Sequence, residues 1–299
     1  MNVRPATWDD LGAVLDVARA ADIAVAGASD WTESDMRDEW QDLDLERDAW
    51  VFELGGAVRG FASFENRGGR LIGDGYVHPE FRGRGIGSAI LETTERRARE
   101  GAVLPAPIQN ATLNQDDATT RFYERHGYAR VRHFWRLVAE LEREHDVVAP
   151  AGIELRAYRH PDDARAVHAA LEEAFLDHWN NRPRPFDEWS KRIFDERHFD
   201  PTLWRVAADG DDVAGAVVCE SKRHGDWGWV GILGVRPAWR RRGIADALLH
   251  ASFAEFFRRG ERRVALAVDA QNPTGATRLY ERAGMRVFWE AVVWEKELA

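Results

Sequence analysis

The stretch Val77-His-Pro-Glu-Phe-Arg-Gly-Arg-Gly-Ile-Gly87 decides the fold, because the chain contains it twice. The second copy is Val235-Arg-Pro-Ala-Trp-Arg-Arg-Arg-Gly-Ile-Ala245, displaced by 235 − 77 = 158 residues. Downstream, Arg121-Phe-Tyr-Glu-Arg-His-Gly127 matches Arg278-Leu-Tyr-Glu-Arg-Ala-Gly284 at a displacement of 278 − 121 = 157 residues. Two matched blocks at nearly one displacement indicate an internal duplication, and the period is too long for a solenoid repeat. We therefore expect two domains of one fold.

Length and composition fit this expectation and exclude several classes of protein. The 299 residues suffice for two domains, and 44% of them are hydrophobic, so each domain can bury a core. The formal net charge of −10 argues against nucleic-acid binding, which needs a clustered basic face. The single cysteine, Cys219, excludes an intrachain disulfide and a cysteine-rich zinc site. The histidines show no ligand spacing such as His-x-x-x-His, so no metal is expected.

The chain has no apolar segment of the length that a signal-peptide core or a membrane span requires. We expect a cytoplasmic protein that does not bind membranes and acts as a monomer or homodimer. The polar and then Pro/Gly-marked segment 142–152 is typical of a linker. It predicts domains at residues 1–146 and 147–299.

Within each half, hydrophobic periodicity and turn residues follow the same order. The order is one strand, two helices, three strands, a long helix, a strand, a short helix and a last strand. It predicts an α/β fold (mixed α+β), in which each domain is a mixed β-sheet flanked by helices.

The glycine-rich turns stand where a strand is expected to give way to the long helix. Small residues there leave the first backbone N–H groups of the helix uncovered, and with the helix dipole these donors form an anion site. Neighbouring arginines add charge-assisted hydrogen bonds, so a pyrophosphate is a suitable ligand. The alternative is that the glycines only permit a tight turn. The pattern is neither a Walker loop, since it lacks Gly-Lys-Ser/Thr, nor a Rossmann fingerprint, since it follows the fourth strand.

The turn motif, followed by an Asn and by [Phe/Leu]-Tyr-Glu-Arg-x-Gly, resembles the GCN5-related N-acetyltransferase (GNAT) superfamily. The resemblance covers both halves, and the second half is most similar to mycothiol synthase-type GNAT domains. It implies a tandem GNAT protein that is an acyltransferase with acetyl-CoA as its acetyl donor. It also implies that the sheet of each domain is split between its fourth and fifth strands.

The resemblance further implies which residues contact acetyl-CoA. Amides of the turns would hold the pyrophosphate, the end of the fourth strand would pair with the pantetheine arm, and downstream polar residues would complete the site. In this sequence these are Arg82, Gly83, Arg84, Gly85, Ile86, Gly87 and Ser88 with Gly75, Tyr76, Val77 and Asn114 in the first half, and Arg240, Arg241, Arg242, Gly243, Ile244, Ala245 and Asp246 with Leu233, Gly234, Val235, Asn272 and Arg278 in the second.

Tyr123 and Tyr280 match the tyrosine that is often proposed in this family to protonate the leaving thiolate. A phenol with a pKa of about 10 is uncharged at pH 7 and can donate a proton to a thiolate. The alternative for each is a packed aromatic ring whose hydroxyl has a partner within the protein.

A general base is also expected, because only a neutral amine attacks. Many family members have a Glu six residues before the valine that ends the fourth strand, but Leu71 and Trp229 stand there. Asp74 is expected, by the alternation of a strand, to point to the opposite face. Glu220 and His178 are the leading candidates, and water could carry the proton instead. The other candidates are Glu65, His78, His224 and Asp177.

The two halves offer different acceptor regions. Asp177–Trp189 brings together Trp, Asn and Arg, which suit a small polar acceptor or simply form a loop pinned by aromatic rings. Residues 1–50 hold 4 basic and 13 acidic side chains, which fit a solvated helix face or an acidic rim for a cationic substrate.

We therefore expect an N-acetyltransferase that moves the acetyl group of acetyl-CoA to the amine of a small metabolite. Turnover is expected mainly in the C-terminal domain, while the first domain binds CoA without turning it over. The alternative is a non-catalytic sensor or scaffold that binds CoA or acetyl-CoA.

Overall fold

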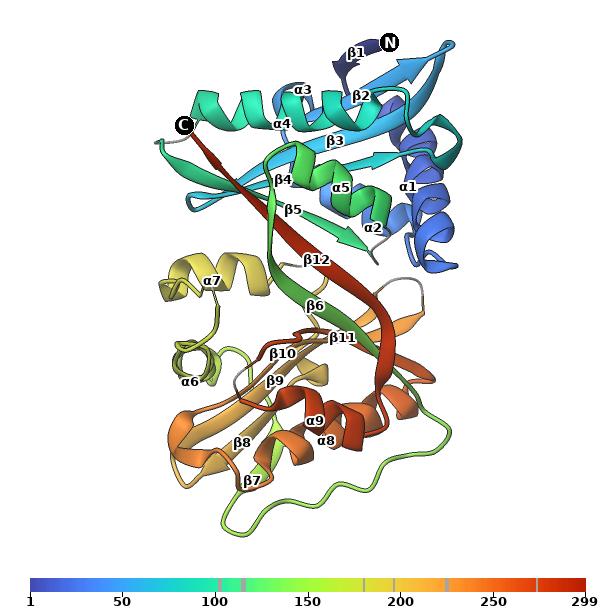
Figure 1. Ribbon diagram of the computed structural model, residues 1–299. Coiled ribbons are helices and arrows are strands. Elements are labelled where there is room, and N and C mark those ends of the chain that lie inside the picture. The colour runs from blue at the N-terminus through green and yellow to red at the C-terminus, as the bar shows by residue number, and fades with distance from the viewer. Residues whose placement is uncertain (102–103, 114–116, 180, 196, 224–225, 273) are drawn as a thin grey trace. The chain divides into compact units, whose positions relative to one another are not determined.

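Each half of the chain contributes most of one mixed β-sheet flanked by helices (Figure 1). The computed structural model describes residues 1–101, 104–113, 117–179, 181–195, 197–223, 226–272 and 274–299. These residues form two compact units, one of Met1–Phe134 with Trp289–Ala299 and the other of Trp135–Phe288. The expected fold class is confirmed.

In the first unit, the strand order is β1-β2-β3-β4-β5-β12. The neighbours are antiparallel except β4 and β5, which are parallel. Its elements are β1 (Asn2–Pro5), α1 (Leu11–Ala26), α2 (Glu33–Gln41), α3 (Leu45–Asp48), β2 (Ala49–Leu54), β3 (Ala57–Arg67), β4 (Arg70–Val77), α4 (Ile86–Gly101), β5 (Ala106–Leu113), α5 (Asp117–Arg125) and the greater part of β12 (Arg286–Leu298).

The second unit repeats this plan, with the strand order β6-β11-β10-β9-β8-β7. Its central strands β10 and β11 are again the parallel pair. Its elements are the later part of β6 (Ala129–Glu140), β7 (Glu154–Ala157), α6 (Ala164–Ala174), α7 (Phe186–Ile193), β8 (Arg205–Asp209), β9 (Asp212–Arg223), β10 (Trp227–Val235), α8 (Ile244–Arg258), β11 (Arg263–Asp269) and α9 (Ala276–Arg282).

Both sheets are split between their fourth and fifth strands. In the first, backbone pairing joins Leu71 to Ile108 and Ile72 to Gln109 and does not extend to the later described residues of β4 and β5. In the second, pairing between the described residues of β10 and β11 is confined to Gly228 with Val264 and Trp229 with Ala265. The strand ends that follow therefore part, as the resemblance implied.

Helices cover the first sheet on both faces. Val14 of α1 and Trp40 of α2 pack with Phe61 of β3 in one buried cluster. Ile90 of α4 packs with Ala62 of β3 in another. Because Phe61 and Ala62 are consecutive in a strand, their side chains point to opposite faces, so α1 and α2 lie on one side and α4 on the other.

The two halves of the sequence exchange one strand. β12, from the end of the second half, pairs with β5 of the first unit along its length. β6, from the end of the first half, lies beside β11 of the second unit. The compact units thus differ from a division of the chain at residues 146 and 147. The hydrophobic pattern identifies the strands, but it does not say which strand is the neighbour of which.

A buried ion pair distinguishes the two final strands from each other. Lys296 Nζ of β12 lies 2.8 Å from Glu95 Oε1 of α4, and the Tyr128 hydroxyl donates to the same oxygen at 3.2 Å. The duplication offsets of 158 and 157 align Glu95 with Phe253 and Lys296 with Ala139, and both of these are buried and apolar. If β6 and β12 changed places, the Glu95 carboxylate would keep its longer cationic contact, with Arg99 at 3.3 Å, and the Lys296 ammonium would lie at the place of Ala139, where the aligned helix offers Phe253. The pair therefore favours the observed pairing.

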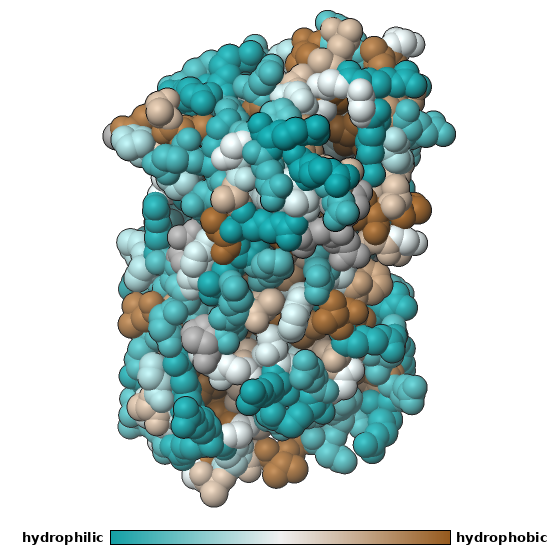
Figure 2. Space-filling view, in the orientation of Figure 1, coloured by the Kyte–Doolittle hydropathy of each residue, from teal (hydrophilic) through white to brown (hydrophobic). Residues whose placement is uncertain are grey.

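The surface gives no sign of a membrane-spanning segment. No helix of the described residues is both long and apolar enough to cross a membrane. On the face drawn in Figure 2, hydrophilic residues predominate and apolar residues are scattered among them.

We expect Lys296→Met to lower the free energy of unfolding by about 1–2 kcal/mol, because it leaves the buried Glu95 carboxylate with Arg99, at the longer distance of 3.3 Å, as its cation. The double variant Glu95→Leu with Lys296→Met should recover most of this loss, since apolar packing replaces the pair. Urea denaturation of the full chain measures both. Arg37→Met, which breaks the exposed pair with Glu33, is the control and should cost about 0.5 kcal/mol or less. A double variant no more stable than Lys296→Met contradicts the role given to the pair.

Candidate functional site

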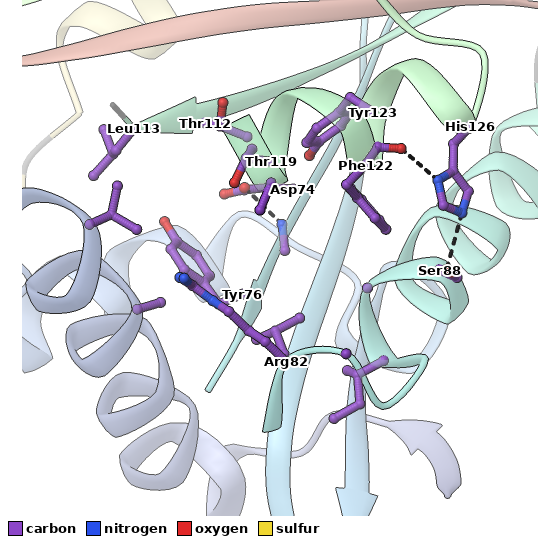
Figure 3. A pocket seen from close by; sticks show the side chains of 18 of the residues that line it. Asp74, Tyr76, Arg82, Ser88, Thr112, Leu113, Thr119, Phe122, Tyr123 and His126 are labelled. Atoms are coloured by element: carbon purple, nitrogen blue, oxygen red, sulfur yellow. Dashed lines mark hydrogen bonds between the residues drawn. The ribbon is translucent and has the colours of Figure 1, made fainter. Parts of the chain in front are cut away.

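A cavity of about 760 Å³ opens where β4 and β5 part in the first unit. It is walled by α1, the end of β4, the glycine turn with the start of α4, the end of β5, and α5 (Figure 3). The residues that line it are Ala21, Asp22, Val25, Asp74, Gly75, Tyr76, Val77, Phe81, Arg82, Gly83, Gly85, Ile86, Gly87, Ser88, Ala111, Thr112, Leu113, Ala118, Thr119, Phe122, Tyr123, Arg125, His126 and Ala291.

The glycine turn forms one end of this cavity as a cradle of backbone amides. Gly83 and Gly85 have φ of 73° and 85°, in the left-handed region that favours glycine. At Gly87 a Cβ atom would lie 3.2 Å from Cζ of Phe122, so α5 packs directly on the first turn of α4. The turn therefore presents uncovered N–H groups and the positive end of the α4 dipole to the cavity. This geometry suits an anion such as a diphosphate.

A histidine links this turn to α5. His126 Nδ1 lies 2.8 Å from the Phe122 carbonyl oxygen, and Nε2 lies 3.0 Å from the Ser88 hydroxyl oxygen (Figure 3). A carbonyl only accepts, so Nδ1 carries a hydrogen and the neutral ring accepts the Ser88 hydroxyl hydrogen at Nε2. His126 thereby fixes the helix that carries Tyr123 to the phosphate-facing end of α4.

Asp74 lines the cavity. It lies on the face of β4 opposite Leu71, as the alternation of the strand predicts, but the cavity is on this face, so the expectation that Asp74 stands outside the site is wrong. Cβ atoms at Gly73 and Gly75 would meet Thr94 and Ile90 of α4, so these glycines face α4. Asp74 therefore points to the other face of β4, where α1 closes the cavity. The expectation failed because it took the family's Glu position as the only one that faces the site.

The electrostatics of Asp74 suit a proton acceptor. Burial, opposed by a hydrogen bond and assisted by the negative charge of Glu65, raises the pKa of Asp74 to about 6. In this bond the Gly75 N–H donates to Asp74 Oδ1 at 2.8 Å. A carboxylate with a pKa near 6 is ionised at neutral pH and is still more basic than an ordinary Asp.

Tyr123 stands across the same cavity on α5. Its ring stacks on Trp294 of β12 with 4.9 Å between centroids and meets Tyr128 edge-on at 5.4 Å. Burial raises the pKa of Tyr123 above its ordinary value, and the negative charge of Asp74 adds to the effect. The phenol therefore keeps its proton at neutral pH and lies within electrostatic reach of Asp74 (Figure 3).

The matching turn of the second half has a different environment. The side chain of Arg240, which aligns with Arg82, bonds to Asp177 Oδ2 at 3.0 Å and to the Ala174 carbonyl at 2.8 Å. The Arg240 guanidinium is thus engaged by the end of α6, whereas Arg82 is exposed at the cavity wall. Arg241 has φ of 62° where the first half has Gly83.

The acceptor side of the second half is apolar where that of the first is acidic. Asp10 and Asp163 occupy equivalent positions, because each pairs with an arginine, in β1 and in β7 respectively. The two aspartates are 163 − 10 = 153 residues apart. This offset aligns Asp22 with Phe175. The turn offset aligns Asp74 with Ile232 and Tyr76 with Gly234. A Cβ atom at Gly234 would lie 3.1 Å from Phe175 Cε2, so the phenylalanine ring covers this glycine.

The other candidate residues of the second half have these surroundings. Tyr280 is 8% exposed, and burial raises its pKa to about 12. Asn272 Oδ1 accepts hydrogen bonds from the Thr274 backbone N–H and hydroxyl, so this side chain closes a local turn. Glu220 pairs with Arg223 at 3.4 Å, and the His178 ring lies 4.4 Å from that of Phe175. Asn114 and His224 lie outside the described residues.

Two residues of the first site were not among the expected ligands or catalytic groups. His126 follows the Tyr-Glu-Arg motif directly, and Asp22 lies in the acidic first 50 residues, so each had a weak signal. Their role as cavity walls depends on packing between helices far apart in the sequence, which no local pattern gives.

A split mixed sheet with an amide-lined turn at the start of its central helix, present twice, defines a class of acyl-group transferases. The acetyltransferase (GNAT) family model matches residues 164–285, and an acetyltransferase (GNAT) domain model matches residues 46–130. The chain belongs to the GNAT family and is an acyltransferase with tandem GNAT domains.

Individual relatives agree with this assignment. The chain is 29% identical over 298 residues to a mycothiol acetyltransferase of Geodermatophilus obscurus, covering 96% of this chain and 94% of the relative. It is 31% identical over 243 residues to that of Thermobispora bispora, with 77% of each chain covered. Among solved structures, a GCN5-related N-acetyltransferase from Sphaerobacter thermophilus superposes with a TM-score of 0.89 at 33% identity, covering 99% of this chain and 95% of that one. A tandem GNAT protein from the clavulanic acid biosynthesis pathway shares the fold, with a TM-score of 0.77 at 19% identity over 99% and 98% of the chains.

Because the pKa of Asp74 is raised in the folded chain to about 6, its ionised form destabilises the fold above that pH, and the cost vanishes below about pH 4. We therefore expect Asp74→Asn to raise the free energy of unfolding by about 1–2 kcal/mol at pH 8 and by little at pH 4.5. Urea denaturation at both pH values measures this. Asp16→Asn, on the exposed face of α1, is the control. An equal effect of Asp74→Asn at both pH values would contradict the assignment.

Proposed function

We propose that the protein is an N-acetyltransferase that transfers the acetyl group of acetyl-CoA directly to a small-molecule amine, and that the first-half cavity carries the reaction. The observation that supports this is the meeting of an anion cradle, a carboxylate with a raised pKa and a neutral phenol around one cavity. The mycothiol acetyltransferase relatives support the reaction class.

The residues of the cavity suit acetyl-CoA as donor. The amides of Gly83–Ser88, the α4 dipole and the Arg82 guanidinium provide positive potential for the diphosphate. The parted edge of β4 at Gly75–Val77 leaves backbone groups for the amide-containing pantetheine arm. When bound, the donor supplies an activated acyl carbon in a thioester.

The proton transfers can be assigned to two side chains. The amine nitrogen bonds to the acyl carbon as the carbon–sulfur bond breaks, so one proton must leave the nitrogen and one must reach the sulfur. Asp74 takes the first as general base, and the Tyr123 hydroxyl donates the second. Because Asp74 and Tyr123 both line the cavity, solvent can return the proton from the carboxyl group to the phenolate.

This proposal reverses the expectation that turnover belongs to the second half. There Ile232 replaces Asp74, Phe175 covers Gly234, and Arg240 is bonded to Asp177. The second half retains Tyr280, but no carboxylate takes the place of Asp74. The alternative, a CoA-binding sensor without turnover, is distinguished by whether any amine causes CoA thiol release.

Removing the proton donor tests the choice of half. We expect Tyr123→Phe to lower kcat by about 100-fold or more and to change acetyl-CoA affinity little, because only the hydroxyl is lost. Tyr280→Phe, the matched change in the other half, should leave turnover within about twofold. CoA release in steady state and calorimetric titration with acetyl-CoA measure the two quantities. The reverse pattern would place the reaction in the second half.

The pH dependence tests the base. Burial raises the Asp74 pKa to about 6. Below about pH 6, kcat/KM should therefore fall by a further factor of about ten per pH unit, in addition to the decrease caused by protonation of the amine. Asp74→Asn should lower kcat by about 100-fold or more and remove this limb. Glu220→Gln, at the position expected from sequence, is the control. Loss of the limb in Glu220→Gln but not in Asp74→Asn would refute the assignment.

A further inference from the structure

We propose that the acetyl acceptor carries a second positive charge, and that Asp22 recognises it. The proposal rests on the proposed function, because it concerns the acceptor of the same cavity. The chemical class is a small aliphatic diamine or polyamine, with one amino group at Asp74 and another ammonium group at Asp22.

Asp22 is a buried carboxylate at the cavity wall. It belongs to the later turns of α1, is 4% exposed and lines the cavity. The Ser29 hydroxyl donates to Asp22 Oδ2 at 3.1 Å, which holds the side chain in place. A buried carboxylate is costly unless cations or hydrogen-bond donors compensate it, so a cationic ligand here gains more than one at an exposed acid.

Aromatic rings complete this end of the cavity. Tyr76 lies beside Asp22, since the negative charges of Asp22, Asp74 and Glu39 all act on its hydroxyl. Trp31 meets the Tyr76 ring edge-on with 6.3 Å between centroids. Carboxylates beside an aromatic wall are a favourable setting for an alkylammonium group, whose charge they balance and whose carbon chain the ring covers.

Charges of both signs line the cavity, on different elements. Arg82 and Arg125 belong to the glycine turn and to α5, which suit the anionic donor. Asp22 and Asp74 belong to α1 and β4. A donor diphosphate and a cationic acceptor therefore each have groups of opposite charge in the same cavity.

The second half serves as an internal comparison for the role of Asp22. The aligned helices α1 and α6 bury the same positions, including Val14 with Val167 and Ala21 with Ala174, at the offset of 153. At the next position α1 has Asp22, whereas Phe175 follows the last residue of α6. Since an apolar residue packs at this place in the second half, apolar packing does not require the acid. The position of the Asp22 carboxylate in the cavity wall therefore suits a cationic ligand.

The acidic residues of the first 50 positions also attract a cationic acceptor, over a longer range than Asp22. Residues 1–50, which include α1 and α2, carry 13 acidic and 4 basic side chains. Such an excess raises the local concentration of cations and repels carboxylated acceptors. Of the two interpretations that the sequence left open, this favours the acidic rim.

Three acceptors of equal chain length test the proposal: 1,4-diaminobutane, 1-aminobutane and 4-aminobutanoate, with the three- to six-carbon diamines to cover the spacing. With the full chain and acetyl-CoA, we expect kcat/KM to be at least about tenfold higher for the best diamine than for 1-aminobutane, and lowest for 4-aminobutanoate. Asp22→Asn should remove most of the preference for the diamine by raising its KM, while kcat and the 1-aminobutane reaction change by about threefold or less.

The controls separate this proposal from the proposed function. Asp16→Asn, on the exposed face of the same helix, should leave the acceptor preference intact. Equal rates with diamine and monoamine, or an equal loss for both in Asp22→Asn, would overturn the role of Asp22 while the Asp74 and Tyr123 results stand. If no amine causes thiol release, the proposed function fails. Calorimetry of diamine binding in the presence of CoA then decides: binding that Asp22→Asn abolishes supports the subsite, and no binding overturns it.

Discussion

The parting of two parallel strands is the constraint on which the rest of the structure depends. β4 and β5 pair at Leu71–Ile108 and Ile72–Gln109 and then separate, which leaves backbone groups of both strands without ladder partners. Such groups must find other partners or face solvent. The cavity supplies that solvent, and the Gly75 N–H is satisfied by the Asp74 carboxylate. The strand edge suited to a pantetheine arm therefore also holds the carboxylate to which we assign the base.

Duplication has kept the scaffold of the site in both halves and changed its chemistry in one. Both halves keep the split, the turn and the motif tyrosine, to which we assign the positioning of a CoA-type ligand. The differences gather on the acceptor side, where Asp22, Asp74 and Tyr76 align with Phe175, Ile232 and Gly234. Gly234 has no side chain at the position of Tyr76, but the ring of Phe175, which directly follows α6, packs over Gly234 and fills that space. The second half thus packs apolar side chains at the positions where the first half has two carboxylates.

The sequence predicted the fold and the glycine turn at the start of α4 well, because these depend on local signals. A glycine that must adopt positive φ, such as Gly85, and a helix that begins beside it are visible in a short motif. The acceptor side was predicted poorly, because it forms where α1 meets β4. Asp74 was correctly placed on the face opposite Leu71, but the site was expected on the Leu71 face, where the glycines on either side of Asp74 leave room for close packing of α4 instead. Asp22 gave no sequence signal of its own, because its burial depends on how α1 packs in the folded chain.

Strand exchange is the feature that sequence could least reveal, and it ties the two halves to one another in a specific way. β6 and β12 come from the two copies and occupy equivalent places in the duplicated order, so the order of elements alone does not choose between two pairings. Particular side chains favour the observed one. Lys296 pairs with Glu95, while Ala139 and Phe253 at the aligned positions are buried and apolar, so an exchange of the strands would separate Lys296 from its carboxylate. The same strand carries Trp294, on which Tyr123 stacks. The end of the second half thus builds the wall that holds the tyrosine of the first, and neither half can form that site from its own sequence alone.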